Sequence, residues 1–181
     1  MARDLTSDDA LATEVERIVV GRELRLAAAL RQAERGARDS PVSAALGELR
    51  SAREARLERF QVTGAIPAAH IDAGDPGTAA SWEVAAFEAT VGAALGWAFL
   101  QELRARLDHP VALLDAALDS EPVVPDALRT AAADRSAAPA ATKRVVHEMT
   151  DALLASPVLS AQLGREGALA AFAALFDALP P

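Results

Sequence analysis

Apolar residues recur with the period of an α-helix along the first third of the chain. A first long helix is predicted at about 8–38, because its apolar positions share one face at about 100° per residue. At "DSPVSAAL", Ser40 can cap a new helix and Pro41 suits its first position. A second helix then runs to about Thr63, and the short turn predicts an antiparallel hairpin. The first helix's apolar face consists of Leu11, Val15, Ile18, Val19, Leu26, Ala29, Leu30 and Ala33.

A long crossover and a third helix follow the hairpin. Gly64–Ser81 is rich in Gly, Pro, Ala and Asp and is typical of a loop. The third helix, at about 82–107, is apolar on nearly all sides, so it is expected to be central and most buried. Gly92 and Gly96 would allow a neighbouring helix to approach closely. Glu88 interrupts an apolar run of about seventeen residues, which is short for a membrane span of about twenty. No membrane is expected.

The last third of the chain is divided into short segments by proline. Helices are predicted at about 110–119, 126–137, 140–155, 158–163 and 167–179. No run with the two-residue period of a β-strand is present. The sequence therefore predicts one all-α domain over residues 1–181. Its core is a bundle of three long helices (1–107), and 108–181 adds short C-terminal helices.

Cations fall on the apolar face of the predicted hairpin. In "GELRSAREARLERF", Arg53 and Arg56 share a stripe with Leu49 and Phe60, and Arg22 lies on the corresponding face of the first helix. One interpretation is that their long stems snorkel to solvent. A second is a buried ionic network with an acid such as Glu23 or Glu88, and Glu88 is the preferred partner. In a third, the guanidinium forks hold an anionic ligand, carboxylate or phosphate. The candidate ligand-binding residues are Arg22, Arg53, Arg56 and Glu88.

The order of elements resembles a known superfamily. The segment Glu23–Phe60 looks like the first hairpin of the ferritin-like bundles, particularly their rubrerythrin-like members, and the resemblance covers roughly residues 8–107. It implies a di-iron site built from inward carboxylates and a Glu-x-x-His motif. No Glu-x-x-His is present in this chain, and Arg53 and Arg56 project where that pair would face inward. We therefore expect no di-iron centre, no other metal and no cofactor.

Composition narrows the classes of function. A net charge of −8 and a pI near 4.9 argue against nucleic-acid binding, which needs a basic surface. The absence of cysteine excludes disulfides and zinc-thiolate sites. The N-terminus lacks the apolar region of a signal peptide, so a cytoplasmic protein is expected. Because no Gly-rich phosphate loop or nucleophile motif is present, the sequence does not indicate an enzyme.

These observations leave three hypotheses for function. The first is a non-catalytic helical bundle that binds a partner protein or self-associates as a homodimer or larger homo-oligomer. It is favoured by extra apolar surface on the first and third helices. The alternative is a protein that holds a small anionic or amphipathic ligand in a pocket between helices. The third is a ferritin-like metalloprotein or oxidoreductase with unconventional ligands.

Overall fold

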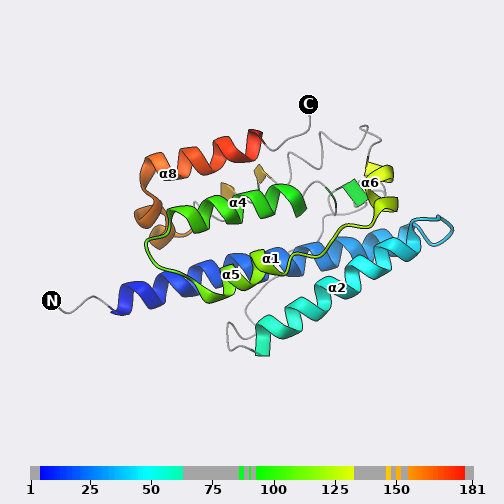
Figure 1. The fold of residues 1–181 in the computed structure, drawn as a ribbon, viewed down its shortest axis with the longest axis horizontal. Helices are drawn as coiled ribbons and strands as arrows, with labels where there is room; N and C mark the ends of the chain where they lie inside the picture. The colour runs from blue at the N-terminus through cyan, green and yellow to red at the C-terminus, as the bar shows by residue number, and fades with distance from the viewer. Residues whose placement is uncertain are drawn as a thin grey trace.

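The described part of the chain is helical and contains no strand, which confirms the all-α prediction (Figure 1). The predicted crossover loop Gly64–Ser81 lies outside the described residues of this computed structural model, and so do Glu88 and Gly92. The structure describes residues 5–62, 86, 87, 90, 93–132, 146, 147, 150, 151 and 155–177.

The predicted hairpin is present. Helix α1 (Leu5–Gly36) and helix α2 (Ser43–Val62) run antiparallel and pack against each other along their length (Figure 1). Helix α2 begins two residues after its predicted start at Pro41, because residues 40–43 form a turn closed by a 3.1 Å hydrogen bond from the Ser43 N–H to the Ser40 carbonyl. Pro41 takes the second position of this turn, which its fixed φ suits.

Helix α1 is the central helix of the described structure. Its residues 18–23 are all buried, so the helix is covered on every side at that level. The predicted third helix is described from Ala93 onward as α4 (Ala93–Arg106), which buries six residues on one face. Most of residues 82–92 lie outside the described part, so the expectation that this helix is the most buried stays a prediction. Ala94, Gln101 and Arg104 are exposed, because α4 packs on one side against α5 (Ala112–Asp119) and α8 (Pro157–Asp177) and faces solvent on the other.

The later helices agree in part with the predicted segments. Helix α5 (Ala112–Asp119) and helix α6 (Asp126–Ala132) begin where helices were expected or within two residues. Two short helices are predicted at 158–163 and 167–179, and this prediction is confirmed, because α8 (Pro157–Asp177) consists of two helical segments separated by a kink at Gly164. Gly164 has φ 63° and ψ 176°, a conformation that glycine adopts without a Cβ penalty. The C-terminal part therefore supplies two short helices in α8, which packs alongside α4 (Figure 1).

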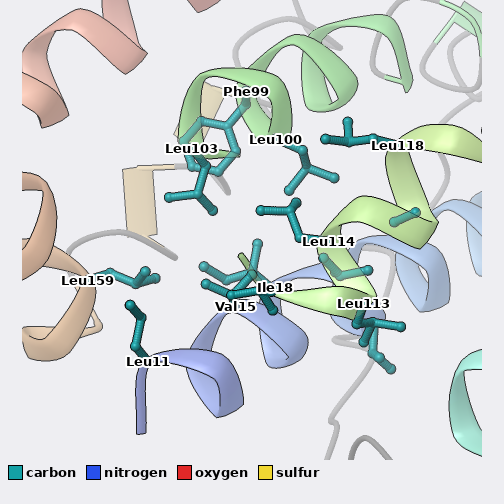
Figure 2. Close-up of a cluster of buried hydrophobic side chains, with 14 of the residues drawn as sticks. Leu11, Val15, Ile18, Phe99, Leu100, Leu103, Leu113, Leu114, Leu118 and Leu159 are labelled. Carbon is teal, nitrogen blue, oxygen red and sulfur yellow. The ribbon is translucent and has the colours of Figure 1, made fainter. Parts of the chain in front are cut away.

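The buried apolar side chains form two clusters at different levels of α1. The first joins the N-terminal half of α1 to α4, α5 and α8, and its leucines converge from all four helices (Figure 2). The second joins the C-terminal half of α1 to the start of α2 and to α6. Between the two levels, α1 contributes Arg22 and Glu23 to the interior, and α2 contributes Arg53 and Arg56. A charged layer thus separates the two apolar clusters.

Candidate functional site

Three arginine side chains lie in the interior between the helices. Arg22 projects from α1, and Arg53 and Arg56 project from α2 one turn apart. The three side chains are 3%, 1% and 1% exposed, respectively. The interpretation that they snorkel to solvent is therefore wrong. Because a buried cation is costly without a counter-charge, the carboxylates around these guanidiniums decide what the site is.

Glu23 is the first of these carboxylates. It follows Arg22 on α1, and its side chain is fully buried. Its Oε1 accepts hydrogen bonds from Arg22 Nη1 at 3.2 Å and Arg53 Nη1 at 2.9 Å, and it lies 3.4 Å from Arg56 Nη1. The predicted ionic network with Glu23 is thus present. Glu88, the preferred partner, lies outside the described residues.

Glu121 is the second carboxylate, and it comes from the non-helical connection 120–125 between α5 and α6. Its Oε1 accepts from Arg22 Nη2 at 2.9 Å and Arg53 Nη2 at 2.6 Å. Its Oε2 accepts from Arg22 Nη1 at 3.1 Å and Arg56 Nη1 at 2.8 Å. All three arginines therefore donate charge-assisted hydrogen bonds to one carboxylate. The buried ion cluster, as defined here, consists of Arg22, Glu23, Arg53, Arg56 and Glu121.

Two backbone carbonyls also belong to this arrangement. Arg22 Nη2 donates to the carbonyl of Ala93 at 2.8 Å, and Arg56 Nη2 donates to the carbonyl of Ala117 at 2.7 Å. Ala117 lies in the last turn of α5, where carbonyls lack helical partners and the helix dipole favours a cation. The Arg56 guanidinium also lies 5.3 Å from the centroid of the Phe60 ring. The buried ion cluster therefore connects α1, α2, α4 and α5.

The cluster holds more positive than negative charge. Its three guanidiniums face two carboxylates, which leaves one net positive charge. The Nε atoms of Arg22 and Arg56 and the Oε2 of Glu23 have no hydrogen-bond partner within the described part of the chain. The cluster therefore favours the binding of an anion, and the Nε groups of Arg22 and Arg56 are donors that its own carboxylates leave unused.

The pKa of Glu121 reflects this environment. Burial of the carboxyl acts to raise its pKa, but hydrogen bonds from Arg22 and the charges of Arg22 and Arg53 outweigh burial. The pKa of Glu121 is consequently lowered from 4.5 to about 2. The side chain is 20% exposed, so Glu121 is the member of the cluster closest to solvent.

Sequence reasoning brought the three arginines together but missed Glu121. The residue follows α5 in "SEPVVP", a stretch with no helical period to place its side chain. The signal in the sequence that could have indicated Glu121 is the excess of inward-facing arginines over acids on α1 and α2. Three inward cations on α1 and α2 with one adjacent acid require a further carboxylate from another element.

A second feature is a pocket beside the cluster. It has a volume of about 550 Å³ and lies between α1, α2 and α5. This interhelical pocket shares Phe60 with the surroundings of Arg56, and its lining residue Ser120 directly precedes Glu121. Its lining residues are Glu16, Arg59, Phe60, Ala112, Leu113, Ala116 and Ser120.

The pocket is apolar inside and charged at its edge. Phe60 and Leu113 are buried in its wall, whereas Arg59 and Ser120 are exposed. Burial raises the pKa of Glu16, the acid among the lining residues. Neither Glu16 nor Arg59 makes an ion pair within the described part of the chain. The pocket thus offers an apolar wall, one carboxylate and one guanidinium to a ligand.

Other kinds of site receive no support from the geometry. Among the described residues, no group of three or more His, Asp or Glu side chains is placed to hold a metal ion. The helices of this part of the chain include none that is long and apolar enough to cross a membrane. Comparison with family models, curated proteins and solved structures found no match to this chain.

Proposed function

We propose that this chain is a non-catalytic helical-bundle protein that binds an amphipathic small molecule in the interhelical pocket. The observation that carries the proposal is the pocket itself, an apolar space of about 550 Å³ with charged groups at its edge. Small-molecule sites in proteins are usually clefts of about 300–1,000 Å³ with apolar walls and a few polar groups. The pocket has this size and this distribution of polarity.

The lining indicates the chemistry of the ligand. Phe60 and Leu113 provide a wall for an apolar body, and the small side chains of Ala112 and Ala116 leave room for it. Glu16 would pair with an amine head group, whereas Arg59 would pair with a carboxylate or phosphate. Because the pocket is lined by both the Glu16 carboxylate and the Arg59 guanidinium, the first experiment has to determine whether the ligand's head group is cationic, anionic or neutral.

Calorimetric titration with decanoate, decylamine and decanol tests the proposal, since these probes share an apolar chain and differ in the head group. Ala116→Trp fills the pocket from its α5 side and should lower the affinity at least 10-fold. Ala105→Trp, on the exposed surface of α4, is the matched control and should leave the affinity unchanged. Absence of binding by all three probes, or equal binding by the two variants, would contradict the proposal.

Binding of a partner protein or self-association, the first hypothesis from the sequence, stays a prediction. Within the described residues, Val123 and Leu169 are the large apolar side chains that are exposed, at 81% and 60%. They belong to different elements, the 120–125 connection and α8, so they do not by themselves define a contact surface. The ferritin-like resemblance and the expected absence of a di-iron centre also stay predictions. The pocket is the feature that favours ligand binding over these alternatives.

A further inference from the structure

The three arginines of the buried ion cluster surround Glu121 as a binding site surrounds a ligand. An ionised carboxylate has about four lone-pair sites on its two oxygens. In Glu121 each oxygen accepts two hydrogen bonds, and the four donors come from Arg22, Arg53 and Arg56 at 2.6–3.1 Å. This pattern is multidentate recognition of a carboxylate by guanidinium forks, the geometry for which Arg is suited.

Glu121 and Glu23 are carried by different kinds of backbone: Glu23 lies within a helix, whereas Glu121 lies in a non-helical connection. Glu23 is anchored within α1 and is fully buried, so it is a fixed part of the interior. Glu121 is carried by the non-helical connection 120–125, in which Val123 is 81% exposed. Its carboxylate therefore enters the cluster from the solvent side. A group of the same chemistry could enter from that side too.

The charges left behind also favour an anion. With Glu121 in place the cluster keeps one net positive charge, and without it three guanidiniums would face Glu23 alone. The Nε groups of Arg22 and Arg56 are buried and have no partner within the described residues. A desolvated site with this excess of donors attracts an anion strongly, since burial strengthens charge–charge interactions.

We infer that Arg22, Arg53 and Arg56 form a carboxylate-binding site, that Glu121 is its built-in occupant, and that a free carboxylate occupies the site when Glu121 is absent. The two-oxygen arrangement, in which each carboxylate oxygen accepts two of the four hydrogen bonds, assigns the ligand class as carboxylate. The site is separate from the interhelical pocket, so this inference does not depend on the function proposed above.

Restoring the missing group from solution tests the inference. Glu121→Ala removes a CH₂–COO⁻ group, which acetate replaces. In the full-length protein at pH 7, sodium acetate should raise the melting temperature of Glu121→Ala saturably, by about 5–10 °C at 100 times its dissociation constant. Sodium chloride at equal concentration should not produce this rise, and wild type should respond less than the variant because Glu121 fills its site.

Two matched variants separate a specific site from a general salt effect. Glu54→Ala removes a carboxylate that pairs with Arg31 and Arg50 at the partly exposed surface of the hairpin, so acetate should not restore its stability. Glu121→Gln keeps the shape of the side chain and fills the space, so acetate should not stabilise it. Equal responses of Glu121→Ala and either variant would overturn the inference. A stronger effect of inorganic phosphate than of acetate would overturn the assignment to carboxylates.

The test also covers a variant that does not fold. If Glu121→Ala is unfolded in chloride, far-ultraviolet circular dichroism replaces the melting experiment. Recovery of helical signal with acetate, and not with chloride, is then the expected result. A chain that stays unfolded at every acetate concentration would contradict the inference.

Discussion

The guanidinium of Arg22 occupies the space that the missing side chain of Gly96 leaves on α4. A Cβ atom at Gly96 would lie 2.7 Å from Arg22 Nε and 3.4 Å from its Cδ. The close approach expected at this glycine is thus made by an arginine stem, whose far end is fixed by hydrogen bonds to Glu121 and Ala93.

Gly96→Ala should therefore destabilise the protein, although alanine is the better helix former. We expect a loss of about 1–3 kcal/mol from overpacking, measured by urea denaturation. Gly21→Ala on α1 is the matched control, because its Cβ would meet Arg25 Nη1 at 3.6 Å, an ordinary contact. That substitution should stabilise the protein by about 0.5–1 kcal/mol. Equal effects of the two substitutions would show that Arg22 is free to move away from α4.

Glu23→Gln should be far more damaging than an equivalent change at the surface. The variant leaves three buried guanidiniums facing Glu121 alone, and the expected loss in unfolding free energy is about 3–5 kcal/mol. Glu54→Gln breaks pairs with Arg31 and Arg50, whose side chains are 54% and 25% exposed, and should cost about 0–1 kcal/mol. Denaturant titration of both variants measures the difference. A loss at Glu23 no larger than at Glu54 would contradict the buried network.

Glu121 should make the protein sensitive to acid. Burial acts to raise its pKa, but Arg22 and Arg53 outweigh burial, so the pKa falls from 4.5 when unfolded to about 2 when folded. Since the folded pKa is the lower one, the stabilisation is complete above pH 4.5 and is lost as the pH falls towards 2. It amounts to about 3 kcal/mol.

The matched experiment compares the unfolding free energies of wild type and Glu121→Gln between pH 6 and pH 2. Other acids titrate in both proteins, so the difference between the two curves isolates Glu121. The wild-type advantage should be largest near pH 6 and should shrink below pH 4.5. A difference that does not change with pH would mean that Glu121 titrates normally.

Gly164→Ala should weaken the packing of α8. The residue has φ 63° and ψ 176°, a conformation that costs a residue with a Cβ about 1–3 kcal/mol, although no atom lies within 4 Å of the added group. Gly167→Ala, three residues later, is the control. Its Cβ would make ordinary contacts of 3.4 Å with Leu163 and 3.6 Å with Arg106, and its effect should be below about 1 kcal/mol. Thermal melting of both variants tests whether strain at Gly164, and not crowding, causes the loss.

Helical periodicity was sufficient to predict the hairpin and the inward direction of its cations. The spacing of Arg53 and Arg56 from Leu49 and Phe60 places all four on one face of α2. Periodicity could not predict Glu121, because the direction of a side chain in a connection depends on how the flanking helices pack. The interhelical pocket was hidden for the same reason, since its walls come from three helices that are distant in sequence.

Helix α1 is buried over a wider range of its surface than its predicted apolar face suggests. Helix α1 is central because its middle is covered on all sides: its buried Val20 lies outside the predicted apolar face, and its buried Glu23 lies at the edge of that face. A pattern of one apolar stripe underestimates burial wherever several partners surround a helix. The break predicted between 163 and 167 is confirmed, because Gly164 has the non-helical φ of 63° and ψ of 176°.

The position of Glu121 in the chain has a consequence for the order of folding. Glu121 is separated by 99 residues from Arg22, and a chain still under synthesis contains α1 and α2 long before it contains Glu121. Until Glu121 is present, the three arginines of the hairpin have Glu23 as their counter-charge within the cluster. Removing water from between α1 and α2 at this stage would bury unbalanced positive charge, which is energetically costly. We therefore expect water to stay between α1 and α2 at the level of Arg22 until α5 has formed. Exclusion of water from the buried ion cluster is then a late folding step, because it requires the contact between Arg22 and Glu121, which are distant in sequence. The hairpin of α1 and α2 can form earlier, because its contacts are close in sequence.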